Sequence, residues 1–158
     1  MQKNQLVRSL LVCAATCMLS TAAFAGENWV GSWKLNPAKS NFGSAAAVRG
    51  LTLTFEATPA GIKLTSDGTD PQGKPIHGGY VSKFDGKDVP WTGNPVADTA
   101  CAKKVDESTY ENIWKKDGKA VITAKAAVSK DGKTLTVTQT GTDPQGGAIN
   151  SVMVYDRQ

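Results

Sequence analysis

Short runs of alternating apolar and polar residues recur along most of the chain. Leu51, Leu53 and Phe55 share one face of such a run, and the threonines between them occupy the other. Leu135 and Val137 alternate with threonines in the same way. A period of two residues is typical of a strand with one buried face, and the branched Cβ of threonine suits a pleated surface. The pattern predicts half-buried antiparallel strands.

Turn residues separate these runs. Asp-Gly pairs occur at 85–86, 117–118 and 131–132, and Asp-Pro-Gln-Gly occurs at 70–73 and 143–146. Glycine permits a positive φ, proline fixes φ, and Asp-Gly between alternating runs is a strong hairpin signal, so consecutive strands should pair. Nine strands are predicted, at residues 29–35, 50–57, 61–68, 75–85, 99–106, 109–116, 119–129, 133–141 and 148–156.

Two irregular connections, 36–48 and 86–98, contain prolines, and each has room for a single helical turn. A long series of antiparallel strands must hide its edges, and closing the sheet on itself does so completely. We therefore predict an all-β, antiparallel, up-and-down β-barrel of about 8 to 10 strands. A two-sheet β-sandwich is the alternative, because short alternating strands also build that fold.

The N-terminus has the form of a secretory signal peptide. Lys3 and Arg8 precede an uncharged apolar run, and Ala23-Phe24-Ala25 supplies small residues at the −3 and −1 positions, so cleavage is expected after Ala25. The run is shorter than the ~20 apolar residues that cross a membrane, so no stable membrane insertion is predicted. Lipid attachment at Cys13 or Cys17 is the alternative, but the preceding residues do not fit it well.

Removal of residues 1–25 leaves 133 of the 158 residues, the size of a single domain at 26–158. The excised segment carries two basic residues, so the net charge falls from +4 to +2. Basic and acidic residues are interspersed, which argues against nucleic-acid binding. Cys101 is then the only cysteine, and we expect it to pack as a small apolar residue in a strand. The predicted location is periplasmic or secreted.

Gly31-Ser32-Trp33 resembles the Gly-x-Trp motif that opens the first strand of lipocalins, which are calycin-type barrels. In that superfamily the tryptophan plugs one end of the barrel, and a basic side chain from near the last strand lies across it. The resemblance implies this structural role for Trp33 and, with its guanidinium stacked on the indole, for Arg157.

Longer segments resemble a group of exported bacterial proteins of uncharacterised function that are described as lipocalin-like. The similar segments are 31–40, 85–90 with 92–95, and 129–138. That group has no assigned activity or functional residues. The resemblance therefore implies the fold and the compartment only.

The sequence carries no catalytic or metal-binding signature. His77 is the only histidine, and its strand phase places it opposite Ile76 and Tyr80, on the surface. A zinc site needs three or four Cys, His or carboxylate ligands, and neither a calcium-loop spacing nor a Gly-x-Ser-x-Gly elbow is present. We predict no catalytic residue, no metal and no cofactor, and we therefore favour a protein that is not an enzyme. A cofactor-free isomerase or hydrolase with its site in a barrel pocket stays open as a third alternative.

Several predicted inward faces mix large apolar residues with small or polar ones, such as Ala124, Ala126 and Ser151. Small side chains leave room for a pocket, whereas a filled core favours bulky residues throughout. We therefore predict a barrel that binds a small apolar or amphipathic molecule without chemistry. The alternative is a solid-core structural or interaction module of the cell envelope; the oligomeric state stays open. The candidate ligand-binding residues are Tyr80, Trp91, Trp114, Gln139 and Met153.

Overall fold

The computed structural model describes residues 27–43, 48, 50–142 and 146–158. The predicted signal peptide and its cleavage site lie outside the described residues. The strands are β1 (Gly31–Leu35), β2 (Leu51–Thr58), β3 (Gly61–Thr69), β4 (Pro75–Ser82), β5 (Asp85–Pro90), β6 (Thr99–Lys104), β7 (Thr109–Lys116), β8 (Lys119–Val128), β9 (Thr134–Thr142) and β10 (Ala148–Arg157).

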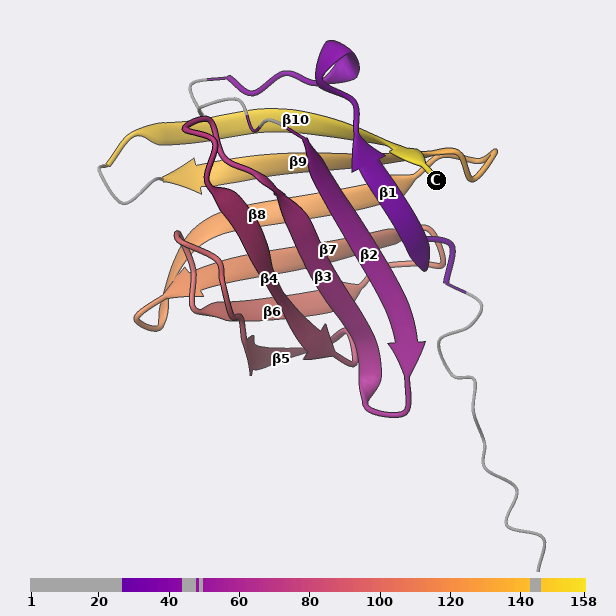
Figure 1. Ribbon diagram of the computed structural model, residues 1–158. Helices are drawn as coiled ribbons and strands as arrows, with labels where there is room; N and C mark the ends of the chain where they lie inside the picture. The colour runs from indigo at the N-terminus through magenta and orange to yellow at the C-terminus, as the bar shows by residue number, and fades with distance from the viewer. Residues whose placement is uncertain (1–26, 44–47, 49, 143–145) are drawn as a thin grey trace, which may run out of the picture.

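All ten strands belong to one antiparallel sheet in the order β4-β3-β2-β1-β10-β9-β8-β7-β6-β5, which curls into a nearly closed barrel (Figure 1). Each strand pairs with its sequence neighbours, except that β4 and β5 form no ladder and that β1 also pairs with β10. The predicted up-and-down barrel is confirmed, and the sandwich alternative is wrong.

The nine predicted strands correspond to β1–β4 and β6–β10, and β5 was missed. The predicted irregular connection 86–98 contains most of this strand, and the hairpin predicted at Asp85-Gly86 is wrong. The chain turns earlier, after Ser82, where Phe84 adopts a φ of 56° and its backbone N–H donates to Ser82 Oγ at 3.0 Å. Five of the six β5 residues are exposed, so β5 lacks the buried face that produces an alternating pattern.

The other irregular connection, at residues 36–48, contains a single helical turn, for which the sequence analysis left room. This turn is η1 (Pro37–Lys39), a 3-10 helix capped by the Asn36 side chain, which accepts a hydrogen bond from the backbone N–H of Lys39. Within the described part of the chain, no helix has the length and apolar character needed to cross a membrane.

The seam between β4 and the segment after β5 closes the barrel. Gly79 and Thr92 exchange two backbone hydrogen bonds there, at 2.9 and 3.1 Å. A Cβ on Gly78 would collide with the carbonyl oxygen of Thr92, and one on Gly93 with that of His77. Glycine inside β4 therefore permits the close backbone approach that nearly closes the sheet.

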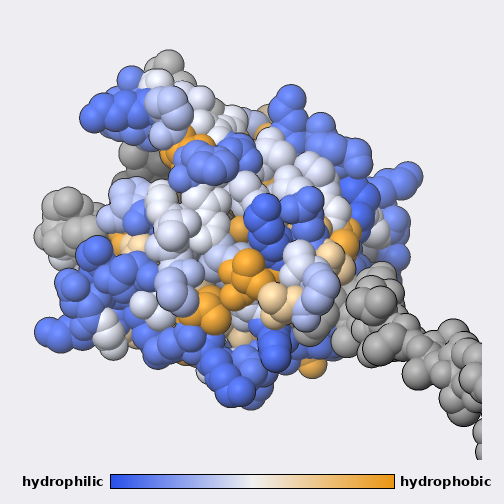
Figure 2. All heavy atoms as spheres, turned by 60° about the horizontal axis from the view of Figure 1, so that its bottom comes forward, coloured by the Kyte–Doolittle hydropathy of each residue, from blue (hydrophilic) through white to orange (hydrophobic). Residues whose placement is uncertain are grey.

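Most of the large apolar residues of the strands face the interior. Of the large hydrophobic side chains in the described chain, only Val81 and Val105 are exposed, at 40% and 51%. Figure 2 shows a mostly hydrophilic surface with a small central group of hydrophobic atoms. The interior thus follows the face assignment that the alternating pattern predicts.

One end of the barrel, called the closed end below, is filled by side chains. Trp29, from the segment before β1, and Trp33 are fully buried, and Trp33 Nε1 donates to the Trp29 carbonyl oxygen at 2.8 Å. The Trp29, Phe84 and Tyr110 rings pack with centroid distances between 5.1 and 5.8 Å. The resulting aromatic cluster leaves this end solid.

The first and last strands, β1 and β10, meet at the closed end, where Arg157 packs against Trp33. The guanidinium carbon of Arg157 lies 4.1 Å from the centroid of the Trp33 ring. Its nitrogens donate to the carbonyl oxygens of Val30 at 3.0 Å, of Gly132 at 2.6 Å, and of Asn28. This is the arrangement of tryptophan and basic side chain that the sequence resemblance implies for Trp33 and Arg157.

Candidate ligand-binding cavity

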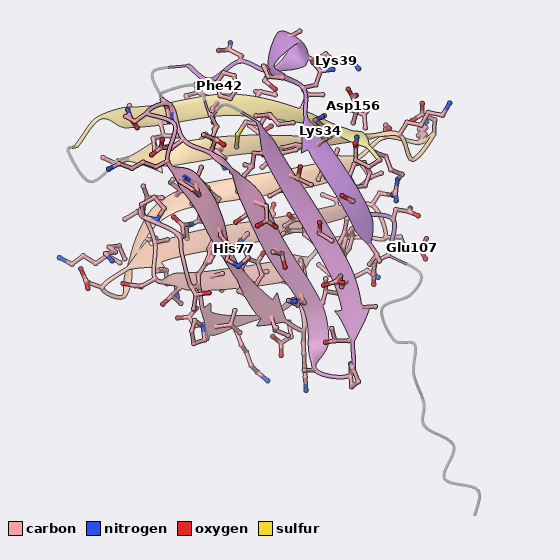
Figure 3. The ribbon with its side chains drawn as sticks, viewed as in Figure 1. Lys34, Lys39, Phe42, His77, Glu107 and Asp156 are labelled. Atoms are coloured by element: carbon pink, nitrogen blue, oxygen red, sulfur yellow. The ribbon has the colours of Figure 1, made fainter. Side chains whose placement is uncertain are left out.

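The opposite end of the barrel, called the open end below, holds a cavity of about 260 Å³. Its wall consists of inward residues from β2, β3, β4, β7, β8, β9 and β10. Two connecting segments complete it, with Phe42 and Val48 on one side and Trp91 and residues 93–96 on the other. Figure 3 shows Phe42 on the segment beside β10, where Asn41 forms a β-bridge with Val152.

The structure brings all five predicted ligand-binding residues to this one cavity: Tyr80, Trp91, Trp114, Gln139 and Met153. Three of them form an aromatic wall. The Trp91 ring lies edge-on to Tyr80 at a centroid distance of 5.0 Å and edge-on to Trp114 at 4.8 Å. Trp91 comes from the connection after β5, so it joins this wall without belonging to a strand.

Small residues occupy inward positions on the neighbouring strands β6 and β8. Ala124 and Ala126 on β8 are buried, as their phase predicted, and so are Ala100 and Ala102 on β6, which the sequence analysis did not single out. Of these four alanines, Ala124 lines the cavity, and its short side chain leaves that space unfilled.

A row of polar and small residues crosses the inner wall of the barrel at one height, that is, at one level along the barrel axis. Ala102 pairs with Asn112, Asn112 with Ala124, Ala124 with Gln139, and Gln139 with Ser151. All five side chains are at most 7% exposed. We call Asn112, Gln139 and Ser151 the inner polar row.

Hydrogen bonds satisfy this row only in part. Ser151 Oγ donates to Gln139 Oε1 at 3.3 Å, and Asn112 Nδ2 donates to the Tyr80 hydroxyl at 3.1 Å, from β7 to β4. Asn112 Oδ1 is buried and has no partner among the described residues. An unpaired buried acceptor costs about 1–3 kcal/mol, so this atom is a candidate contact for a bound molecule.

Asn112 was missed from the sequence. Its signal is an amide in inward phase between two aromatic residues, Tyr110 and Trp114. A polar residue at such a position is unexpected for a half-buried strand. Only the registers from β7 through β8 and β9 to β10 show that it joins Gln139 and Ser151 at one height.

The described cavity lining contains no Asp, Glu, Lys, Arg, His or Cys. Its only titratable groups are the hydroxyls of Tyr80, Tyr110 and Tyr155, and burial raises the pKa of each well above its ordinary value. These hydroxyls therefore remain neutral at physiological pH. General acid–base catalysis at neutral pH needs a group that titrates near 7, and none of the described lining residues supplies one.

The two residues with potential reactivity lie elsewhere. His77 projects from the outer face of β4, as predicted, with Nδ1 2.5 Å from Asp67 Oδ1 (Figure 3). Cys101 on β6 is half-buried, and its thiol donates to the Gly86 carbonyl oxygen at 3.1 Å. Burial raises the pKa of the Cys101 thiol, and the adjacent Asp88 carboxylate adds to that effect, so the nucleophilic thiolate is disfavoured.

The strand order and the internal cavity define a class of barrel that solved structures also contain. Zebrafish ileal bile acid-binding protein complexed with cholic acid aligns with this chain at a TM-score of 0.52 and 9% sequence identity, over 84% of this chain and 100% of that one. No protein-family model and no curated protein sequence matches the chain. At this identity the likeness concerns the fold alone, which is calycin-type and lipocalin-like.

Proposed function

We propose that the protein is an exported lipocalin-like barrel that binds a small apolar or amphipathic molecule and performs no catalysis. The observation that carries the proposal is the cavity of about 260 Å³ at the open end, with its predominantly apolar lining. A concave apolar site with a few polar groups is the usual form of a small-molecule site. The zebrafish neighbour, whose structure holds cholic acid in a barrel of the same fold, supports a carrier function.

The volume sets the size of the occupant. Drug-sized ligands occupy pockets of about 300–1,000 Å³, and this cavity lies just below that range. At ~30 Å³ for each water-sized group, it encloses about nine non-hydrogen atoms. The ligand is therefore either small or an extended molecule whose remainder leaves through the open end.

Two further functions fit the observations less well. A structural or interaction module with a solid core predicts no internal space, and the cavity argues against it. A cofactor-free isomerase or hydrolase predicts carboxylates converging on the pocket, and the described lining has none. The signal-peptide pattern of residues 1–25 supports a periplasmic or secreted location after cleavage at Ala25.

Native mass spectrometry tests the proposal directly. The protein lacking residues 1–25, purified from the periplasm of the cells that make it, should carry a reproducible extra mass that leaves on unfolding. A bare protein mass, together with unchanged tryptophan fluorescence across a panel of amphiphiles, would contradict the proposal.

A matched pair of variants locates the site. Ala124 points into the cavity, and its neighbour Thr123 points outward from the same strand. Ala124→Phe should fill the cavity and remove the extra mass, whereas Thr123→Phe should retain it. Equal retention by both variants would place the bound molecule outside the barrel.

A further inference from the structure

The polar atoms left unpaired around the cavity include both an acceptor and donors. Asn112 Oδ1 is an unpaired acceptor, and the indole N–H groups of Trp91 and Trp114 are buried donors with no partner among the described residues. All three residues line the cavity, and Asn112 is 3% exposed. A hydroxyl or amide group both donates and accepts, so it complements this set.

A charged group does not complement the set. An ionised carboxylate only accepts hydrogen bonds, so it leaves Asn112 Oδ1 unpaired, and an ammonium only donates, so it leaves the indole N–H groups unpaired. The described lining also contains no opposite charge to pair with either ion. Transfer of an unpaired ion out of water is strongly unfavourable, so the group neutralises instead.

The height of Asn112 along the barrel sets the orientation. The inner polar row lies deeper than Trp114, Ile122 and Ile149, which occupy the adjacent inward positions toward the open end. An amphiphile can therefore place its polar end at Asn112 while its apolar part contacts these side chains. The reverse orientation would leave Asn112 Oδ1 unpaired.

Building on the proposed function, we infer that the cavity selects amphiphiles with an uncharged hydroxyl or amide end over carboxylates of the same chain length. Asn112 is the residue that contacts this end and determines the preference. Octan-1-ol and octanoate are suitable probes, because a nine-atom alcohol matches the enclosed volume of about 260 Å³ at ~30 Å³ per group.

Isothermal titration calorimetry of the wild-type protein between pH 6 and pH 8 tests the selection. The pKa of octanoate is close to that of a glutamate side chain, about 4.3, so its neutral fraction falls tenfold for each pH unit in this range. Octanoate affinity should therefore fall about a hundredfold from pH 6 to pH 8.

Octan-1-ol affinity should not change over the same range, because nothing around its polar end titrates there. The groups that face Asn112 are Tyr80 from β4, Ala102 from β6 and Ala124 from β8. Burial raises the pKa of Tyr80, and the described lining contains no other ionisable groups than its tyrosines.

The Asn112→Leu variant tests the residue assignment. Loss of one hydrogen bond worth about 0.5–1.5 kcal/mol should weaken octan-1-ol binding about two- to thirteenfold. The Thr138→Leu variant is the matched control, since Thr138 points outward from β9 and should leave binding unchanged. Unchanged binding by both variants would overturn the role of Asn112.

The outcomes separate this inference from the proposed function. Octanoate binding as tight as octan-1-ol binding at pH 8 would overturn the inference and leave the carrier function intact. Binding of neither probe at any pH would overturn both. Octan-1-ol binding that is independent of pH, with octanoate affinity falling as described, would support both.

Discussion

The two ends of the barrel are built from the same strands but in opposite ways. At the closed end, Trp29 and Trp33 are fully buried, large rings contact one another, and Trp33 Nε1 has a hydrogen-bond partner. At the open end, Ala124 faces the cavity, and Trp91 Nε1 and Asn112 Oδ1 are unpaired among the described residues. The difference lies in side-chain size, because buried polar atoms without a partner among the described residues occur at both ends, including Trp29 Nε1 at the closed end.

Strand β8 shows the difference within one element. Val128 and Ala126 face Leu135 and Val137 toward the closed end, whereas Ala124 faces the inner polar row two residues further along. The same inward phase thus contributes to packing at one height and to a cavity at the next. We conclude that stability is concentrated at the closed end, which leaves the open end available for binding.

The largest expected effect is at the closed end. Trp33→Ala removes a fully buried indole, its hydrogen bond to Trp29 and its contact with Arg157, so the free energy of unfolding should fall by about 3–5 kcal/mol. Urea unfolding followed by circular dichroism measures the change. A loss below about 1 kcal/mol would contradict the assignment of stability to this end.

A pair of identical substitutions on β8 compares the two heights. Ala126→Phe places a ring against Tyr110 and Val137 and should destabilise the protein by about 1–3 kcal/mol through overpacking. Ala124→Phe enters the cavity, and its unfolding free energy should stay within about 1 kcal/mol of the wild type. Equal destabilisation by both variants would show that the two heights are packed alike.

The smallest expected effect is on the stability of the protein at acid pH, through Asp156 on the outer surface. Asp156 Oδ2 accepts from Asn36 Nδ2 at 2.6 Å, and Lys39 Nζ lies 2.9 Å from Oδ1. The Asn36 hydrogen bond, with a further contribution from Lys39, lowers the pKa of Asp156. A lowered folded-state pKa contributes stability that is present above the unfolded value of about 3.9 and is lost as pH falls through the folded value.

Thermal unfolding between pH 6 and pH 2 measures this contribution. Asp156→Asn should reduce the steepness of the loss of stability below pH 4, because one titrating group is gone. The open end has no carboxylate among its described lining residues, so Ala124→Phe should leave the acid slope unchanged. A steeper slope in Asp156→Asn than in the wild type would contradict the direction of the pKa shift.

Alternation along single strands was sufficient to predict much of the fold. It placed Tyr80, Gln139 and Met153 inward because each has alternating neighbours with one buried face. It failed for β5, because a strand that is exposed on nearly all its residues shows no apolar period.

The alternating phase within single strands was not sufficient to predict the candidate site. Asn112 and Gln139 lie at one height only because each pairs with Ala124, on opposite sides of β8. Phase tells which face a residue occupies, but the height along the barrel depends on the register between strands. The unpaired Oδ1 of Asn112 depends in turn on the surrounding side chains, so no pattern within one strand predicts it.

The pairing of β1 with β10 also determines when the barrel is completed during synthesis. The hydrogen bond from Arg157 to Val30 joins residues 127 positions apart, and Trp33 pairs directly with Arg157. Contacts so distant in sequence form slowly, because a long loop must close before they contribute. A chain that emerges N-terminus first therefore carries an unprotected Trp33 until Arg157 arrives, and a nascent chain stopped before β10 lacks the partner that completes the wall.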